Sequence, residues 1–394
     1  MHPMNTIDDC RYCSVVSQAN GEDPLGTAEF YHHWFIFEVP RPWGDALWDY
    51  PPLEYLMKIS SKLILQKGEI IKVVMVAPDK EYSQEGQTRI IHYYRPKKMF
   101  AEFEKQEYIL PNLEPDLGEV ISLLDTILYH PRQLDKFNIY YQDTKHIREM
   151  IICTHTKVDL ACGRFGTPIY RKLRQEYTTK ANANIRVWQS SHFGGHQFAP
   201  TLIELPAGRL WGHLDDDILD PLVWHHNNYH HSSKQVSGAL EEEPETQLLK
   251  QLRPYYRGWT GWGKWLQIAE GEIWLNESLS GKCEWLNYYK KGQIIDVGGI
   301  GIKKYLVSIL TTILNFIPSQ RIQIICDRIS KKAAWVKVRI KFTAPDGSRS
   351  GEYTAKVIEK GQVISAKDSA PSRKDKLHLQ SVKQYQVTNL QLNE

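Results

Sequence analysis

Cysteine is scarce in this chain, with six cysteines spread over 394 residues. This scarcity excludes a disulfide-rich scaffold, and the uneven spacing favours free thiols or metal ligands in a reducing compartment. An excess of one charge is also lacking, because 49 Lys and Arg residues stand against 46 Asp and Glu residues and leave a formal net charge of +3. A balance this close to neutral gives no indication of nucleic-acid binding.

Long apolar runs are lacking as well. The N-terminus, MHPMNTIDDCRYCS, has no apolar core of signal-peptide length and contains acids instead. The most apolar later stretch, residues 300–317, is interrupted by Lys303 and Lys304, and the part that remains is too short to cross a bilayer. We therefore expect a cytoplasmic protein with no membrane span.

The length and composition are those of a folded protein with several domains. Hydrophobic residues make up 42% of the chain and charged residues 24%, which are ordinary values for globular proteins. A chain of this length is long enough for two or three domains. The order of the expected elements predicts an α/β fold, with tandem thioredoxin-like domains followed by a C-terminal α+β accessory domain.

The first predicted domain spans residues 1–140. Helical spacing and β-branched or aromatic content predict strands over Phe30–Pro40, Glu69–Ala77, Thr88–Tyr94 and Lys98–Glu104, and helices over Pro51–Gly68 and Leu117–Tyr129. The order strand, helix, strand, strand pair, helix matches a thioredoxin-like unit. Because this unit has no ligand set of its own, we interpret it as degenerate.

The second predicted domain, residues 141–232, repeats this order. Its expected strands are Glu149–Cys153, Asn184–Gln189, Thr201–Leu205 and Arg209–Gly212, with a basic helix over Arg164–Lys180 and a final helix from Asp215–Asp217. A proline is allowed at the first residue of a strand. We expect the Ala199–Pro200 step to be the cis-proline step of a thioredoxin fold.

The third predicted domain spans residues 244–394 and follows a polar linker over 226–243. Four tryptophans near its start, Trp259, Trp262, Trp265 and Trp274, are expected to pack its core, with a partner-binding surface as the alternative. Strands are expected over Ala334–Thr343 and Gly351–Ile358. The charged residues 367–376 predict a mobile tail.

Two pairs of soft metal ligands stand out in the second predicted domain. Cys153 and Cys162 lie in ICTHTKVDLACGRFG, and His192 and His196 lie in SSHFGGHQFAPT. In a thioredoxin-like sheet the loop after the first strand and the loop before the cis-proline strand lie side by side. The two pairs are therefore expected to meet at one end of the sheet.

The spacing of these ligands bears on the kind of centre. Structural zinc fits the ligand types, but its cysteines usually lie two to four residues apart. The wider separation of Cys153 and Cys162 leaves a loop that can surround a larger group. A [2Fe–2S] cluster needs four protein ligands, and two of them can be imidazoles, which raises the reduction potential. Three glycines, Gly163, Gly194 and Gly195, would let the backbone approach an inorganic centre closely.

The chain resembles the sucrase/ferredoxin-like family, whose members are relatives of the thioredoxin-like ferredoxins. The resemblance rests on CTHTKVDLACGRFG (153–166), LRQEY (173–177), RVWQSSHFGGHQFAPTLIELPAGRLWGHL (186–214), GEDPLGTAEF (21–30) and PRPWG (40–44), within residues 10–214. It implies that the second domain is a ferredoxin domain whose [2Fe–2S] cluster is bound by Cys153, Cys162, His192 and His196. One departure is Thr156, where many relatives have glycine; it leaves the ligands intact and stiffens the loop.

This resemblance implies one-electron transfer or redox sensing rather than substrate turnover. The sequence has no defined carboxylate pair for glycoside hydrolysis and no nucleotide-binding fingerprint. Electrons are therefore expected to arrive from a separate reductase and to leave to a redox acceptor that the sequence does not name. The alternatives are a zinc-stabilised interaction protein and a thiol oxidoreductase of thioredoxin-like fold.

Other residues of the same types have more ordinary interpretations. Cys10 and Cys13 form a CxxC pair, but the pair precedes every expected strand, so free thiols in a flexible leader are favoured over a redox dithiol. His155 is favoured as a donor that supports the ligands, or as a structural residue of the loop, rather than as a fifth ligand. Asp159 is expected to brace the loop.

Three further features are expected to lie outside the metal chemistry. The basic run Lys157, Arg164, Arg171, Lys172 and Arg174 fits a solvated helix face, with docking of an acidic electron-transfer partner as the alternative. The histidine tract HHNNYHH (225–231) lies in the expected linker and fits a solvated segment. Cys283 and Cys326 are interpreted as ordinary thiols.

Overall fold

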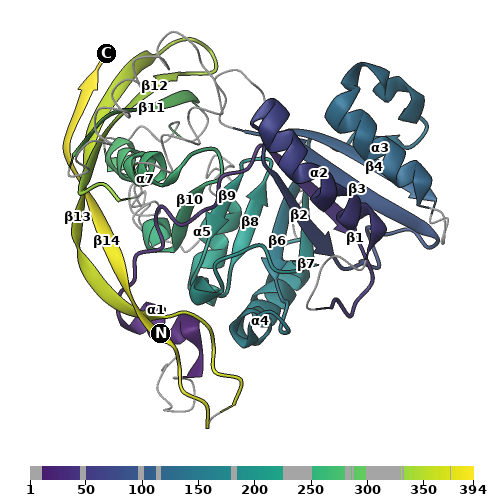
Figure 1. Ribbon diagram of the computed structural model, residues 1–394, viewed down its shortest axis with the longest axis horizontal. Coiled ribbons are helices and arrows are strands. Elements are labelled where there is room, and N and C mark those ends of the chain that lie inside the picture. Colours follow the sequence, from purple (N-terminus) through teal and green to yellow (C-terminus); the bar gives the residue numbers. More distant parts are fainter. Residues whose placement is uncertain are drawn as a thin grey trace, which may run out of the picture.

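The computed structural model has a mixed α/β architecture, as the sequence predicts. It contains a ten-stranded mixed sheet and a separate four-stranded antiparallel sheet (Figure 1). The residues that it describes are 11–44, 50–95, 102–111, 117–178, 184–224, 251–279, 285, 288–298, 330, 332–372 and 374–394. Cys10, Cys283, Cys326, the linker 226–243 and the histidine tract lie outside these ranges.

The N-terminal half of the large sheet is formed by the first predicted domain. Its strands are β1 (His33–Glu38), β2 (Ile71–Val76), β3 (Gln87–Tyr94) and β4 (Glu104–Pro111). The short strand β5 (Tyr141–Gln142), just past the predicted boundary at 140, pairs with β4 at the edge of the sheet. β1 pairs in parallel with β2 and antiparallel with β3, and β3 pairs antiparallel with β4. Helices α2 (Pro51–Lys67) and α3 (Gly118–Tyr129) lie together over one face of this half, and the short helix η3 (Pro131–Phe137) follows α3 (Figure 1).

The strand predicted over Lys98–Glu104 is misplaced toward the N-terminus. β4 instead covers Glu104–Pro111, and residues 98–101 are outside the described ranges. The physical reason is that Lys105 and Glu107 are buried inside β4, where they take part in an ion-pair network. Buried charges of this kind hide the apolar pattern by which a strand is found in a sequence.

The C-terminal half of the sheet is formed by the second predicted domain. Its strands are β6 (Arg148–Cys153), β7 (Ile185–Ser190), β8 (Leu202–Leu205) and β9 (Arg209–Trp211), with helices α4 (Leu160–Glu176), η4 (His196–Phe198), η5 (Asp216–Ile218) and α5 (Leu219–Trp224). β6 pairs in parallel with β7 and antiparallel with β8, and β8 pairs antiparallel with β9. The Ala199–Pro200 peptide is cis, as predicted.

The two halves meet between β2 and β7. Among the described residues, the backbone contact there is short. Val76 and Ser190 form the one register pair, flanked by hydrogen bonds from the amide of Ala77 to Gln189 O at 3.0 Å and from the amide of Ser191 to Met75 O at 2.8 Å. A shared apolar cluster contains Trp34 and Val74 from one half and Ile151 from the other, together with both candidate cysteine ligands. The core that surrounds the candidate site therefore draws on both predicted domains.

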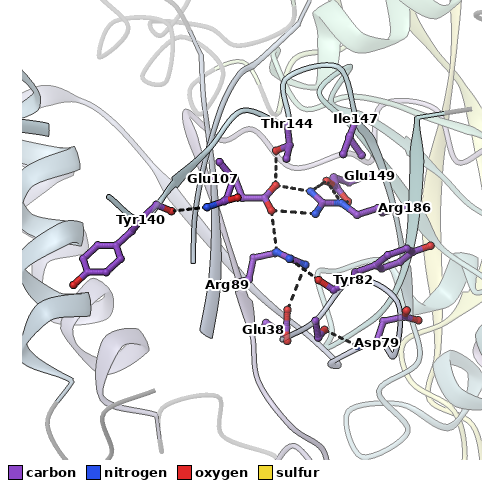
Figure 2. A network of polar contacts seen from close by, with 12 residues as sticks. Glu38, Asp79, Tyr82, Arg89, Glu107, Tyr140, Thr144, Ile147, Glu149 and Arg186 are labelled. Atoms are coloured by element: carbon purple, nitrogen blue, oxygen red, sulfur yellow. Dashed lines mark hydrogen bonds and ion pairs between the residues drawn. The ribbon is translucent and has the colours of Figure 1, made fainter. Parts of the chain in front are cut away.

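Buried charges connect the same two halves (Figure 2). Glu107 of β4 pairs with Arg186 of β7 and, at 2.9 Å, with Arg89 of β3. Glu149 of β6 pairs with Arg186 as well, and it receives Lys105 Nζ of β4 at 2.7 Å. All five side chains are buried, so each charge depends on its partners for stabilisation.

The third predicted domain contributes to both sheets. Strands β11 (Tyr289–Gly298), β12 (Trp335–Thr343), β13 (Ser350–Ala366) and β14 (Leu379–Asn393) form the antiparallel sheet, which curves round α7 (Lys264–Leu279) (Figure 1). The short helix η6 (Arg253–Tyr255) leads into β10 (Tyr256–Trp259), which joins the edge of the large sheet by pairing with β9. The tryptophans at 259, 262, 265 and 274 are buried, as expected for core residues.

The segment before β1 packs far from its neighbours in sequence. Helix α1 (Cys13–Ala19) contacts η4 and β13, and Figure 1 shows it below the long strands β13 and β14. Within the described ranges, every helix is too short or too polar to span a bilayer.

Candidate metal centre

Two cysteines lie where β6 ends and α4 begins. Cys153 is the last residue of β6, and its amide donates to the carbonyl of Thr201 at 3.2 Å. The carboxylate of Asp159 caps α4 by accepting from the amide of Ala161 at 2.8 Å, as the free amides of a first helical turn require. This cap starts the helix earlier than predicted, and it places Cys162 in the first turn, where its side chain is fully buried.

His192 reaches the same place from the neighbouring strand. β6 and β7 are parallel, and Cys153 is in register with Ser190 at their common end. His192 Nδ1 lies 3.6 Å from Cys153 Sγ and 3.7 Å from Cys162 Sγ. The three donor atoms all lie within 4.8 Å of one another. The structure thus brings together three of the four side chains that the sequence singles out.

The two thiols differ in their affinity for a proton. Burial raises the pKa of Cys153, but the hydrogen bonds from Cys162 and His192 outweigh burial and hold this pKa well below its ordinary value. The hydrogen bond to Cys153 raises the pKa of Cys162, and burial raises it further. Cys153 is therefore the more acidic thiol of the pair, and both thiols would be deprotonated when a metal binds.

His196 lies at the same end of the sheet but faces a different set of donors. Its ring centroid lies 5.5 Å from that of His192. Its Nδ1 lies 3.4 Å from Cys13 Sγ and 3.4 Å from Asp159 Oδ2. These three residues form a second group whose donor atoms lie within 4.8 Å of one another. The fourth predicted ligand is therefore next to the first group but turned toward Cys13 and Asp159.

The flexible leader predicted around Cys13 is wrong, because Cys13 opens α1 and is fully buried. Tyr12 packs edge-on against Phe165 of α4, with ring centroids 5.1 Å apart. Ser17 shares a hydrogen bond of 3.2 Å with His213 Nε2. These partners are far away in sequence, so no local pattern announces them.

Burial also controls the protonation of Cys13. It raises the pKa of this thiol to about 12, and the nearby charge of Asp159 adds to the increase. Cys13 therefore keeps its proton at neutral pH as long as no metal binds it.

The C-terminal segment encloses the second group. Ser369 Oγ donates to Asp159 Oδ1 at 2.6 Å, and the amide of Ser369 donates to Asp159 Oδ2 at 2.8 Å. The amide of Cys13 donates to Ser369 Oγ at 3.1 Å, and His196 Nε2 lies 3.7 Å from Asp368 Oδ1. The segment predicted as a mobile tail is thus bonded to the candidate site at Ser369.

The loop between Cys153 and α4 packs tightly on the helix. Thr156 Oγ1 lies 1.9 Å from where a Cβ on Gly163 would be, so Gly163 makes room for Thr156 rather than for an inorganic centre. His155 is buried, and its Nδ1 accepts from the amide of His192 at 3.4 Å. This contact supports the backbone of a candidate ligand, which is the role favoured for His155.

A buried cation from the third predicted domain holds the histidine loop. Arg257 of β10 donates from Nη1 to the carbonyl of Gly194 at 3.1 Å and from Nε to Thr27 Oγ1 at 3.2 Å. A Cβ on Gly195, where φ is +79°, would lie 2.2 Å from its guanidinium. Glycine at 195 is therefore required both by the backbone conformation and by the close approach of Arg257.

Among the described residues, Arg257 bonds to Gly194 and Thr27 and has no carboxylate within ion-pair distance, although it is only 2% exposed. Burial lowers its pKa to about 10, and the negative charges of Glu29, Cys153 and Cys162 partly offset this effect. The side chain therefore remains charged at neutral pH. The sequence gives no signal for this residue, because its partners lie in two distant segments.

The basic run on α4 is partly neutralised by acids. Arg174 donates to Asp79 at 2.9 Å and 3.0 Å and pairs with Glu81 at 2.9 Å, and Lys172 pairs with Asp216 at 3.2 Å. The exposed members of the run are Lys157, Arg164 and Arg171. Only these three fit the solvated face predicted for the whole run.

The donor chemistry of this end of the sheet fits a sulfur- and nitrogen-ligated metal centre. Cys153 and Cys162 supply two soft thiolates, and His192 directs an imidazole nitrogen at both of them. His196 supplies a second imidazole, whose ring centroid lies 5.5 Å from that of His192. A two-iron cluster takes four such ligands, and the buried charge of Arg257 would favour the reduced, more negative state of such a group.

Comparison with known sequences adds one finding. A family model described as sucrase/ferredoxin-like matches residues 24–239, which is more than half of the chain. No curated protein and no solved structure matches the chain.

Proposed function

The chain belongs to the sucrase/ferredoxin-like family, and on this premise we propose that it is a [2Fe–2S] protein of electron transfer or redox sensing. The proposed ligands are Cys153, Cys162, His192 and His196. The observation that carries the proposal is the convergence of Cys153 Sγ, Cys162 Sγ and His192 Nδ1 in a buried group, with His196 beside it.

The proposal includes a fold of two tandem thioredoxin-like domains, with boundaries at 1–140 and 141–232, and an accessory domain over 244–394. The strand order β2-β1-β3-β4 in the first half has its counterpart in β7-β6-β8-β9 in the second half. In each half the first two strands are parallel and joined through a helix, and the last two are antiparallel. This repeated topology supports an internal duplication of one α/β unit.

The residues around the proposed cluster have distinct tasks. When bound, the cluster would supply a reversible one-electron acceptor. Cys153 and Cys162 lie in an apolar cluster shared by both halves of the sheet, which excludes water from the sulfur side. A ligating histidine keeps a second ring nitrogen that can exchange a proton with its surroundings, and His196 is 18% exposed. Electron uptake can thereby be coupled to proton uptake on the histidine side.

We further propose that the protein works in the cytoplasm with a separate reductase as electron donor and a further redox protein as acceptor. Two exposed basic residues, Lys157 and Arg164, flank the start of α4 near Cys162 in sequence, and a third, Arg171, lies farther along the helix. An acidic partner surface would be attracted to this charge. The cysteines that the structure describes are free thiols, in keeping with a reducing compartment.

The test is the metal and sulfide content of anaerobically purified protein. The proposal predicts about two irons and about two acid-labile sulfides per chain, with visible thiolate-to-iron absorption. Replacement of His192 by Ala should reduce the iron content. The matched His130→Ala change, at a histidine whose side chain is 55% exposed, should leave it unchanged. Colourless protein with one zinc per chain would instead support the zinc-stabilised interaction protein.

A further inference from the structure

The candidate site holds one more soft donor than a two-iron cluster needs. Four ligands saturate such a cluster, yet the two adjoining donor groups contain five thiol or imidazole side chains. The donors are Cys13, Cys153, Cys162, His192 and His196. Cys13 is the surplus donor, and it lies beside the one imidazole that faces away from Cys153 and Cys162.

Cys13 is held in this position by contacts from three parts of the chain. Its amide donates to Ser369 Oγ, while its Sγ lies 3.4 Å from His196 Nδ1 and 3.7 Å from Asp159 Oδ1. Tyr12 anchors the start of α1 on α4. The Cys13 side chain is therefore oriented from both sides rather than simply enclosed by apolar residues.

The distance between Cys13 and His196 is the central observation. Cys13 Sγ and His196 Nδ1 are 3.4 Å apart and therefore in direct contact. Exchange of one donor for the other requires both side chains to move, because His196 is turned toward Cys13 rather than toward Cys153 and Cys162. Sulfur and imidazole nitrogen are both ligands of iron–sulfur clusters. Asp159 lies within 4 Å of both groups and can stabilise a proton that moves between them.

We propose that Cys13 is a reserve ligand, which binds the cluster in place of His196 when that imidazole releases iron. The inference rests on the proposed function. In the exchange, the bond from the His196 nitrogen to iron breaks and a bond from Cys13 Sγ to iron forms. The thiol proton passes to the freed imidazole, and no electron is transferred. The ligand set changes from two thiolates and two imidazoles to three thiolates and one imidazole, which lowers the reduction potential.

This exchange would tie the state of the cluster to the chain termini. Cys13 belongs to the N-terminal helix, and Ser369 belongs to the segment between β13 and β14. A displacement of either segment from η4 would move Cys13 away from His196 and prevent it from binding the cluster. The accessory domain would then have a regulatory part in the redox chemistry, through Ser369.

The test compares iron and sulfide content and the visible spectrum in four anaerobically purified full-length proteins: wild type, His196→Ala, Cys13→Ser and His196→Ala/Cys13→Ser. Cys10→Ser, which removes the thiol that is nearby in sequence, is the matched control. His196→Ala should keep at least half of the wild-type iron and show a spectrum richer in thiolate-to-iron absorption. The iron content of the double variant should be at least tenfold lower than that of the wild type, while Cys13→Ser and Cys10→Ser should stay near the wild-type iron content.

The outcomes separate this inference from the function on which it rests. If wild-type protein lacks iron and sulfide, the proposed function is contradicted, and the reserve-ligand inference that rests on it is overturned as well. If wild type is loaded but His196→Ala is as empty as the double variant, or if the double variant stays loaded, the reserve-ligand inference is overturned. His196→Asn, with a polar side chain of smaller volume, repeats the comparison if circular dichroism shows that His196→Ala is unfolded.

Discussion

At the scale of single residues, the buried thiols lie close to a buried cation. Cys153 and Cys162 are enclosed by apolar side chains, and the cation that holds the adjoining histidine loop is Arg257. Its hydrogen-bond partners, Gly194 and Thr27, are uncharged, so its field is offset only in part, by Glu29 and the two thiols. An electron added at the proposed cluster would therefore be stabilised by it.

Replacement of Arg257 by Gln should lower the midpoint potential of the cluster. The change removes a positive charge from a low-dielectric region, and the expected decrease is on the order of 50 mV. Arg257→Lys should recover part of it. The measurement is a redox titration followed by visible absorption, with Arg253→Gln as control because Arg253 is already neutralised by Asp23 and Glu272. Equal potentials in Arg257→Gln and wild type would contradict this role.

The sequence predicts the members of the site better than their arrangement. The CTHTKVDLAC and HFGGH strings identify all four proposed ligands, and the parallel pairing of β6 with β7 brings their loops to one end of the sheet. The orientation of His196 toward Cys13 could not be predicted, because 183 positions separate the two residues. Arg257 is likewise 63 positions from Gly194. Contacts at such separations leave no periodic pattern in the sequence.

At the scale of secondary-structure elements, the two halves of the large sheet are connected by a short backbone pairing and by a network of buried side chains. β2 and β7 share one register pair, whereas Arg186 of β7 joins Glu107 of β4 and Glu149 of β6 (Figure 2). Trp188 Nε1 adds a hydrogen bond to Glu149 at 2.6 Å. The network therefore fixes β4 against β6 and β7, and thereby supports the strands that end at Cys153 and Ser190.

Replacement of Arg186 by Met should destabilise the fold by about 3–5 kcal/mol, because Glu107 and Glu149 remain buried and lose one of the two cations that they share, with Lys105 left as the other. Urea unfolding followed by circular dichroism measures this loss. The control is Lys58→Met, which breaks the solvent-exposed Lys58–Glu54 pair on α2 and should cost less than about 1 kcal/mol. A loss below about 1 kcal/mol in Arg186→Met would show that the network does not hold the halves together.

The same network predicts a loss of stability in acid. Burial raises the pKa of Glu149, but Lys105 and Arg186 outweigh burial and hold it at about 2, below the ordinary value of 4.5. The unfolded chain thus binds this proton more readily than the folded chain does. The stability contributed by Glu149 is complete above about pH 4.5 and is lost as the pH falls toward about 2.

Urea unfolding at several pH values between about 5 and 2 tests this expectation. The free energy of unfolding should fall steeply in the wild type, and less steeply in Glu149→Gln, which has no proton to gain. Parallel curves for the two proteins would refute the assignment to Glu149. The buried charges of this network also explain why β4 was predicted too early, since Lys105 and Glu107 read as surface residues in the sequence.

The start of α4 could have been predicted more closely. Asp159 is a favoured capping residue directly before the helical pattern, and its side chain does cap the amide of Ala161. The role expected for Asp159 from the sequence is instead to brace the loop. Both descriptions hold, because the same carboxylate also accepts from Ser369.

At the scale of the whole molecule, three segments that are distant in sequence pack at one end of the sheet. They are α1, β10 with Arg257, and the segment that contains Ser369. The α/β class and the repeated strand order could be predicted, since each half alternates strands and helices that are separated by turn residues. The addition of β10 to the sheet edge and the binding of Ser369 beside Asp159 could not, because both depend on docking of the C-terminal part. Short, polar or isolated segments of this kind take their structure from tertiary contacts.

The central claim is that two thiolates and two imidazoles hold one iron–sulfur cluster at this end of the sheet. The most direct test is the nitrogen hyperfine spectrum of the reduced, anaerobically purified protein labelled with ¹⁵N-histidine. The account predicts couplings from two histidine nitrogens in wild type and from one in His192→Cys. A reduced two-iron signal without any histidine coupling, or the absence of such a signal from loaded protein, would contradict it.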